Sequence, residues 1–217
     1  MDNLGLSMNE EILKQITIWM DDGFRGLELA SKYTNYMDKF LTDIFRSIDK
    51  EAQIVLLATG GYGREELAPF SDIDIMFFVK NRANAETVER MLYALWDSGL
   101  EISHAFRTAD ECIEEAFRDI RTRTSLLEAR YIAGDKKLYQ TFRNDVYPAI
   151  AYQKKQVFVR EKLKEMEQRH LESGHSVFLL EPHIKEGEGS LRDIHTVYWL
   201  SRVALKCENL SALSPLL

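Results

Sequence analysis

The spacing of apolar residues changes several times along the chain, and the changes predict an α/β protein. Residues 10–20 and 26–48 contain no proline and place apolar side chains three and four positions apart, as amphipathic helices do. Residues 54–58 form a continuous apolar run that ends in glycines, which is typical of a buried strand. A second strand is expected at about 73–79, where the sequence again becomes strongly apolar.

The segment between these two strands, residues 60–71, is predicted to be a connection. It has room for a short helix around 64–67, before Pro69. After the second strand, a helix over 85–98 is expected, with Asn84 as its N-cap and a glycine at its end.

A third strand is expected at 100–108, a further helix at 109–121, and a segment ambiguous between strand and helix at 125–132. From residue 137 onward the pattern is mainly helical, with a charged helix at 153–171 and a final helix at 191–205. We therefore expect an N-terminal helical segment (1–50), an α/β core (51–136) and a C-terminal helical segment (137–217). The chain ends in SALSPLL, shortly after a helix, so a truncated chain is expected.

Composition narrows the class of protein. With 45% hydrophobic and 29% charged residues, the chain resembles ordinary globular proteins, and neither a membrane span nor a signal peptide is evident. Cys112 and Cys207 lie far apart without metal-ligand spacing, which favours reduced thiols in a cytoplasmic protein. A formal net charge of −7 argues against an extended nucleic-acid footprint.

Two acidic residues, Asp72 and Asp74, carry the most chemical information. Alternation along a strand puts both carboxylates on one face, with Cα atoms roughly 6.5 Å apart at the rise of an extended chain. Two like charges beside a buried strand are costly unless a cation compensates them. The pattern therefore predicts a site for a divalent metal ion.

The glycines that precede the aspartates fit the same chemistry. Gly60 and Gly61 let backbone N–H groups approach phosphates closely, because glycine has no Cβ and tolerates positive φ. Arg64 is a candidate to neutralise phosphate charge, and Ser71 a candidate hydrogen-bond donor beside the metal. No Gly-Lys-Ser/Thr follows, so a Walker A loop is excluded. The combination favours phosphoryl transfer assisted by two metal ions.

The string GGYGREELAPFSDIDI resembles the nucleotidyltransferase superfamily that includes DNA polymerase β. It is closer still to the bacterial PII uridylyltransferase/uridylyl-removing enzymes. Three later segments resemble the same family: LWDSGLEISHAFRT, TSLLEARYIAGD and LEPHIKEGEGSLRDI. The family's second signature usually has proline and glycine where this chain has Glu188 and Ser190, which puts the local loop shape in question. The family's enzymes are also longer, with hydrolase and glutamine-sensing domains that do not fit here.

The resemblance implies a mixed-sheet α/β nucleotidyltransferase domain with flanking helices. By position, Gly60 and Gly61 would shape the triphosphate turn, and Asp72 and Asp74 would bind Mg²⁺ or Mn²⁺. The superfamily usually adds a third carboxylate from a later strand. Its candidates are Glu128, favoured slightly on motif likeness, and Glu101, which lies on a clearer strand.

A later polar set is a weaker signal: Glu181, Lys185, Glu186, Arg192 and Asp193. Its simplest interpretation is a loop followed by a helix whose first turn carries an acidic residue. The functional interpretation is that Lys185 or Arg192 reaches the nucleotide from a second domain.

The activity implied by the resemblance is transfer of UMP from UTP to a tyrosine of the PII signalling protein, with release of pyrophosphate. UTP and PII are the expected partners, without nucleic acid or membrane. Two alternatives stay open. One is an enzyme that transfers AMP to PII or to another protein. The other is a nucleotide-binding regulatory module without turnover.

Overall fold

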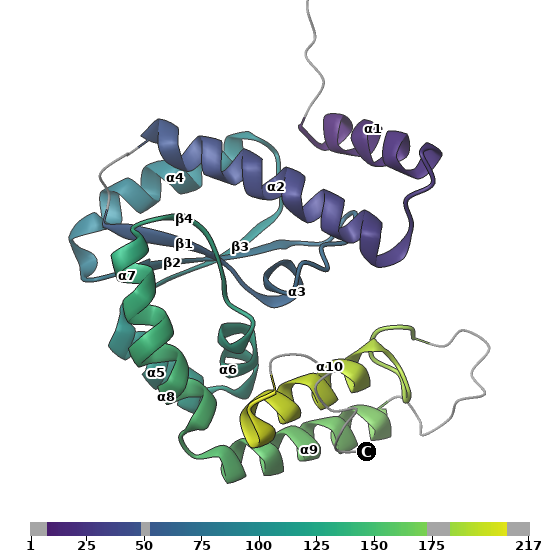
Figure 1. Ribbon diagram of the computed structural model, residues 1–217, viewed down its shortest axis with the longest axis vertical. Helices are drawn as coiled ribbons and strands as arrows, with labels where there is room; N and C mark the ends of the chain where they lie inside the picture. The colour runs from purple at the N-terminus through teal and green to yellow at the C-terminus, as the bar shows by residue number, and fades with distance from the viewer. Residues whose placement is uncertain (1–7, 49–52, 173–182, 208–217) are drawn as a thin grey trace, which may run out of the picture. The chain divides into compact units, whose positions relative to one another are not determined.

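The computed structural model describes residues 8–48, 53–172 and 183–207, and its elements are drawn in Figure 1. In chain order they are α1 (Met8–Asp21), α2 (Gly26–Ile48), β1 (Ile54–Ala58), α3 (Gly60–Gly63), β2 (Ile73–Val79), the 3₁₀ turn η1 (Arg82–Asn84), α4 (Ala85–Asp97), β3 (Ile102–Arg107), α5 (Ala109–Arg118), α6 (Ile120–Leu127), β4 (Arg130–Gly134), α7 (Lys136–Thr141), the π turn η2 (Phe142–Val146), α8 (Tyr147–Tyr152), α9 (Lys155–Glu172), α10 (Leu191–Leu200) and the π turn η3 (Ser201–Leu205).

The sheet has four strands in the order β3-β2-β1-β4. β1 pairs antiparallel with both β2 and β4, whereas β2 and β3 run parallel. The expected mixed sheet with flanking helices is thus confirmed. β1 occupies a central position because all five of its residues are apolar and buried, so both of its faces are covered.

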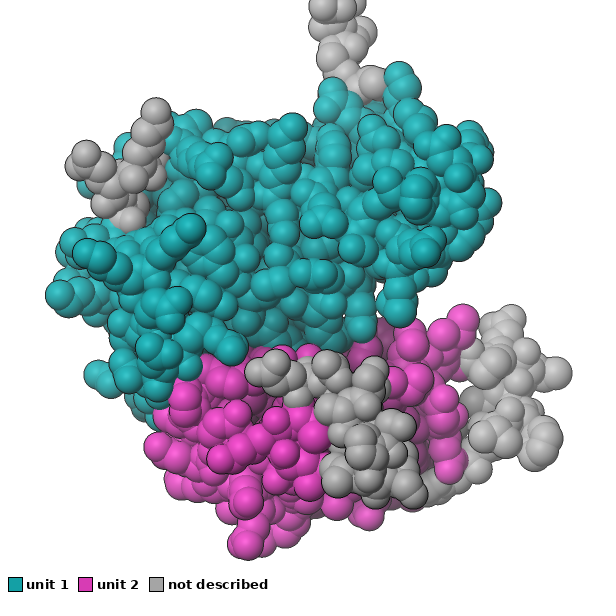
Figure 2. Space-filling view, in the orientation of Figure 1, with its two compact units in different colours: residues 1–115, 128–146 teal, residues 116–127, 147–217 magenta. Residues whose placement is uncertain are grey.

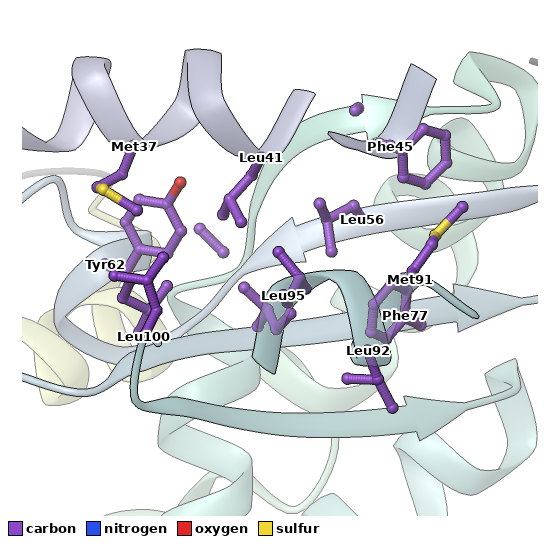
Figure 3. Packing of buried hydrophobic residues seen from close by; sticks show 14 of the residues in the cluster. Met37, Leu41, Phe45, Leu56, Tyr62, Phe77, Met91, Leu92, Leu95 and Leu100 are labelled. Atoms are coloured by element: carbon purple, nitrogen blue, oxygen red, sulfur yellow. The ribbon is translucent and has the colours of Figure 1, made fainter. Parts of the chain in front are cut away.

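One face of the sheet forms the main hydrophobic core. Ile73, Ile75 and Phe77 alternate along β2 and point into this core. Helices α2 and α4 cover this face, and Figure 3 shows their apolar side chains packed over the strands. The buried stripes of these helices are Tyr33, Thr34, Met37, Leu41 and Phe45 on α2, and Val88, Met91, Leu92 and Leu95 on α4.

The intervening residues of β2 point to the opposite face. There Met76 lies 3.9 Å from the buried Cys112 thiol, and the Phe78 ring meets Phe142 edge-on at 5.3 Å. Asp74 occupies the same face at the start of the strand, where it is only partly buried. The sheet therefore has a packed end and a polar end on this face.

Two compact units make up the chain: residues 1–115 with 128–146, which hold the sheet, and residues 116–127 with 147–217 (Figure 2). In the second unit, Arg123 is buried between the rings of Phe117 and Phe158. It donates to the carbonyls of Ile150 at 2.8 Å and Gln153 at 2.7 Å, and burial lowers its pKa to about 10. The three segments expected from the sequence stay a proposal.

Three local expectations need correction. The short helix after β1 comprises Gly60–Gly63 rather than 64–67, because Thr59 is extended and Glu65 has a positive φ of 64° just beyond it. Asn84 is the N-cap residue of α4 as expected, but its side chain makes no cap hydrogen bond and instead donates to the Gln53 carbonyl.

The third correction concerns α5 and α6, and one ambiguous segment is also resolved. The helix expected at 109–121 is interrupted at Asp119, whose carboxylate accepts from the Thr122 backbone N–H at 2.7 Å and so starts α6 as a separate helix. The ambiguous segment 125–132 is the end of a helix followed by a strand. No helix among the described residues is long and apolar enough to cross a membrane.

Gly63 offers a test of how tightly α3 is held. A Cβ at this position would lie 2.3 Å from the Glu128 carbonyl oxygen and 3.1 Å from that of Ala58. Gly63→Ala should therefore lower the free energy of unfolding by about 1–3 kcal/mol, measured by urea denaturation, because backbone atoms must move. Gly61→Ala is the matched control, since its Cβ would meet nothing closer than 3.7 Å. Equal stabilities for the two variants would contradict this close packing.

Candidate active site

The glycine helix α3 lies at the junction of β1 and β2. Thr59 follows β1 in an extended conformation, and its N–H donates to the Asp74 carbonyl at 3.0 Å. Gly60 then turns the chain with a φ of +57°, a conformation that glycine adopts without strain. The two predicted motifs, the paired glycines and the aspartates, are thereby joined by a backbone hydrogen bond.

The carboxylate of Asp74 lies directly against Gly60. A Cβ on Gly60 would be 2.7 Å from Asp74 Oδ2, so any other residue would displace the carboxylate or the turn. Asp72 precedes β2 and is exposed, whereas Asp74 is partly buried. The two aspartates are two positions apart, so alternation along the extended chain puts them on the same face of the sheet. That face is opposite to the main core, into which Ile73 and Ile75 point.

The neighbouring strand contributes further polar groups to this end of the sheet. Asp74 pairs with Ser103 across the parallel β2–β3 ladder, so their side chains share a face. The Ile73 N–H donates to the Glu101 carbonyl at 2.9 Å. Continuing the register by one position sets the exposed Glu101 beside Asp72.

Arg64 follows α3 and folds back over it. Its Nε donates to Glu66 Oε2 at 2.7 Å and its Nη1 to Glu128 Oε1 at 2.5 Å. Its Nη2 lies 3.7 Å from where a Cβ of Gly61 would be. Burial lowers the pKa of Arg64, but the two carboxylates outweigh burial and hold it above the usual value. The guanidinium is therefore charged and fixed next to the glycines.

The Glu128 carboxylate is enclosed, with a side chain that is 2% exposed. Glu128 lies in the turn between α6 and β4, not on a strand, and its carbonyl contacts Gly63. The Ser71 side chain is exposed, and its hydroxyl donates to the Ala68 carbonyl at 2.8 Å.

A second network holds α3 through Tyr62. Asp38 of α2 accepts from the Tyr62 hydroxyl at 2.6 Å and from Nη1 and Nη2 of Arg130 at 2.6 and 3.0 Å. This network was not among the features predicted from the sequence. The available signal was the position of Asp38, four residues after Thr34 and three before Leu41, which puts a carboxylate on the buried stripe of an amphipathic helix.

The donor set at the polar end of the sheet suits a hard divalent cation. Mg²⁺ is usually held by one or two carboxylates together with phosphate oxygens and water, and Asp72 and Asp74 would be the carboxylates here. Among the described residues, no three His, Cys, Asp or Glu side chains form a group that could ligate a metal ion. Two carboxylates beside a glycine turn fit an ion whose other ligands would be phosphate oxygens and water.

The predicted residues of the second unit form their own network. Arg192 donates to Glu186 through Nε at 3.3 Å and Nη2 at 2.9 Å, and Lys185 is exposed. Asp193 accepts from Arg169 at 2.5 Å and from the Gly189 N–H at 2.7 Å, which ties the loop to α9 and α10. Glu181 of this polar set lies outside the described residues.

Comparison with known proteins gives a consistent result. The bifunctional uridylyltransferase/uridylyl-removing enzyme of Phenylobacterium zucineum is 40% identical over 200 residues, covering 84% of this chain and 21% of that enzyme. The enzymes of the same description from Rhodospirillum rubrum and Caulobacter vibrioides are 44% identical over 153 residues and 40% identical over 199 residues. The chain is homologous to the N-terminal region of these bacterial enzymes.

The family model described as GlnD PII-uridylyltransferase matches residues 157–216. These residues belong to the second unit and include Lys185 and Arg192, whereas the glycines and aspartates lie in the region shared with the uridylyltransferase/uridylyl-removing enzymes. The chain spans about a fifth of the length of the curated relatives it matches, since it covers 21% of the Phenylobacterium enzyme and 16% of the Rhodospirillum enzyme.

The Tyr62 network predicts a pH dependence of stability. Burial raises the pKa of the Tyr62 phenol, and Asp38 raises it further, while Arg130 partly opposes this. The unfolded phenol ionises near pH 10, so above that pH only the unfolded state loses this proton and stability falls as pH rises. Tyr62→Phe should reduce this fall by up to about 1.4 kcal/mol per pH unit above pH 10, measured by urea denaturation at pH 9–11. Parallel curves for the two proteins would contradict it.

Proposed function

We propose that this chain carries a nucleotidyltransferase site of the DNA polymerase β type, which transfers UMP from UTP to a tyrosine of a PII signalling protein and releases pyrophosphate. The observation that carries the proposal is the contact of the Asp74 carboxylate with Gly60, because it joins a candidate metal ligand to a candidate phosphate-binding turn. Homology to uridylyltransferase/uridylyl-removing enzymes supports the choice of uridylyl transfer. Because the chain covers only part of those enzymes, their activity, UTP and PII are all part of the proposal.

Asp72 and Asp74 would hold Mg²⁺ or Mn²⁺. Such ions, when bound, neutralise charge on the triphosphate and on the attacking and leaving oxygens. Gly60 and Gly61 would let backbone N–H groups approach the triphosphate, since neither has a Cβ in the way. Arg64 adds a positive charge beside them, and Ser71, next to Asp72 in sequence, would become a further donor if its hydroxyl left the Ala68 carbonyl.

We assign the third carboxylate to Glu101. Glu101 directly precedes β3 rather than lying on it, and the β2–β3 register, continued by one position, sets it beside Asp72, which supports a role at the reacting oxygen. Glu128 has a side chain that is 2% exposed and bound to Arg64, which argues against its accepting a proton from a substrate. In the proposed reaction the tyrosine oxygen bonds to the α-phosphorus, the bond to the pyrophosphate oxygen breaks, and Glu101 receives the tyrosine proton.

Transfer can be tested by incubating the protein with a purified PII protein and UTP labelled on the α-phosphate. Asp74→Asn should lower labelling about 100-fold or more, because the isosteric amide no longer supplies the charge that holds the metal. Circular dichroism should show an unchanged fold. Near-normal labelling by this variant would contradict the mechanism.

The same assay separates the alternatives. Labelling from ATP in preference to UTP would replace uridylyl with adenylyl transfer. Metal-dependent binding of UTP without pyrophosphate release would instead identify a nucleotide-binding module, the outcome favoured if this part of the longer enzymes cannot act alone.

Glu101→Gln tests the assignment of the third carboxylate. Because the side chain is exposed and the change is isosteric, we expect normal folding, a similar KM for UTP and a kcat reduced about 100-fold. Steady-state kinetics at saturating PII would measure both constants. An unchanged kcat would show that Glu101 is not the group that receives the tyrosine proton.

A further inference from the structure

Arg64 binds two carboxylates that differ sharply in exposure. The Glu128 side chain is 2% exposed, whereas the Glu66 side chain is 35% exposed. The two use different parts of the guanidinium: Glu128 binds Nη1, and Glu66 binds Nε. One cation is therefore shared between an enclosed anion and one that faces water.

This arrangement bears on phosphate binding. Two carboxylates already share the single guanidinium, so an incoming triphosphate has to compete with them for it. Arginine binds phosphate most strongly through two parallel N–H groups on one edge, such as Nε with Nη2. Here Nη2 lies over Gly61, and the adjoining Nε is taken by Glu66.

The two carboxylates are not equally easy to displace. Exposed ion pairs contribute little, and a partly exposed carboxylate regains water when it leaves. A buried carboxylate that loses its cation remains an uncompensated charge at a cost of several kcal/mol. The backbone of Glu66 donates to the Gly61 carbonyl at 2.9 Å, so its side chain can swing away while its backbone stays in place.

We propose that Glu66 is a displaceable stand-in for the triphosphate on Arg64, and that Glu128 is the positioning residue that holds Arg64 against the glycine turn during the exchange. This inference rests on the proposed function of the site. Nucleotide binding removes Glu66 from the Nε–Nη2 edge and puts phosphate oxygens in its place, while the Nη1 contact with Glu128 persists.

The two carboxylates should therefore have opposite effects on nucleotide affinity. Isothermal titration calorimetry with UTP in the presence of Mg²⁺ measures the affinity of each variant for the nucleotide. Glu66→Gln should bind UTP about threefold more tightly, because the competing anion is lost. Glu128→Gln should bind about tenfold more weakly, because Arg64 loses its charged anchor. If only the loss of a negative charge mattered, both variants would bind UTP more tightly than the unaltered protein.

Two controls isolate the role of Arg64. Glu65→Gln removes the same charge one residue away, from an exposed side chain whose ion pair is with Arg130. It should change affinity much less than Glu66→Gln. In an Arg64→Ala background, Glu66→Gln should no longer tighten binding. If Glu128→Gln does not fold, the comparison of Glu66→Gln in the two backgrounds decides the question.

The outcomes separate this inference from the proposed function. Absence of binding of both UTP and ATP by the unaltered protein would overturn the proposed function, and this inference with it. Binding by the unaltered protein, with Glu66→Gln no tighter than Glu65→Gln or equally tight without Arg64, would overturn the inference alone.

Discussion

The close approach of a four-residue glycine helix to its neighbours is the constraint on which the rest of the site depends. At one end of α3, Gly60 leaves room for the Asp74 carboxylate, and at the other end Gly63 leaves room for the Glu128 backbone. A side chain at either position would push apart β1, β2 and the turn before β4. The absence of two Cβ atoms thus brings together residues that are 14 and 65 positions away in sequence.

Much of the fold follows from local patterns. The strands at 54–58 and 73–79 were predicted at their observed bounds, because apolar runs flanked by glycine or aspartate leave few alternatives. The helix expected at 85–98 was likewise found to within one residue, at Ala85–Asp97, but the use of the Asn84 side chain was not foreseen, since it donates to the distant Gln53 carbonyl. A tertiary contact of this kind has no signature within the helix itself.

The candidate site was only partly accessible from sequence. Paired glycines and alternating aspartates are short-range features, and their chemistry can be inferred from residue type and spacing. The environment of Glu128 is different: motif likeness favoured it as a catalytic carboxylate, but its burial and its contact with Arg64 depend on how distant segments pack. The register that sets Glu101 beside Asp72 is likewise a property of strand pairing, and no single-strand pattern specifies it.

The Asp38 network has a consequence for where this domain begins. In sequence, the N-terminal helices look like an appendage to an α/β core that starts near residue 51. Yet Asp38 supplies the carboxylate shared by Tyr62 and Arg130, and α2 covers one face of the sheet. A core that began at residue 51 would retain every glycine and aspartate of the motif but lose the hydrogen bonds from Asp38 that hold Tyr62 of α3 and Arg130. The smallest segment that could be transferred with its site intact is therefore larger than the segment that bears the motif. It has to include α2, because Asp38 of that helix binds Tyr62 and Arg130.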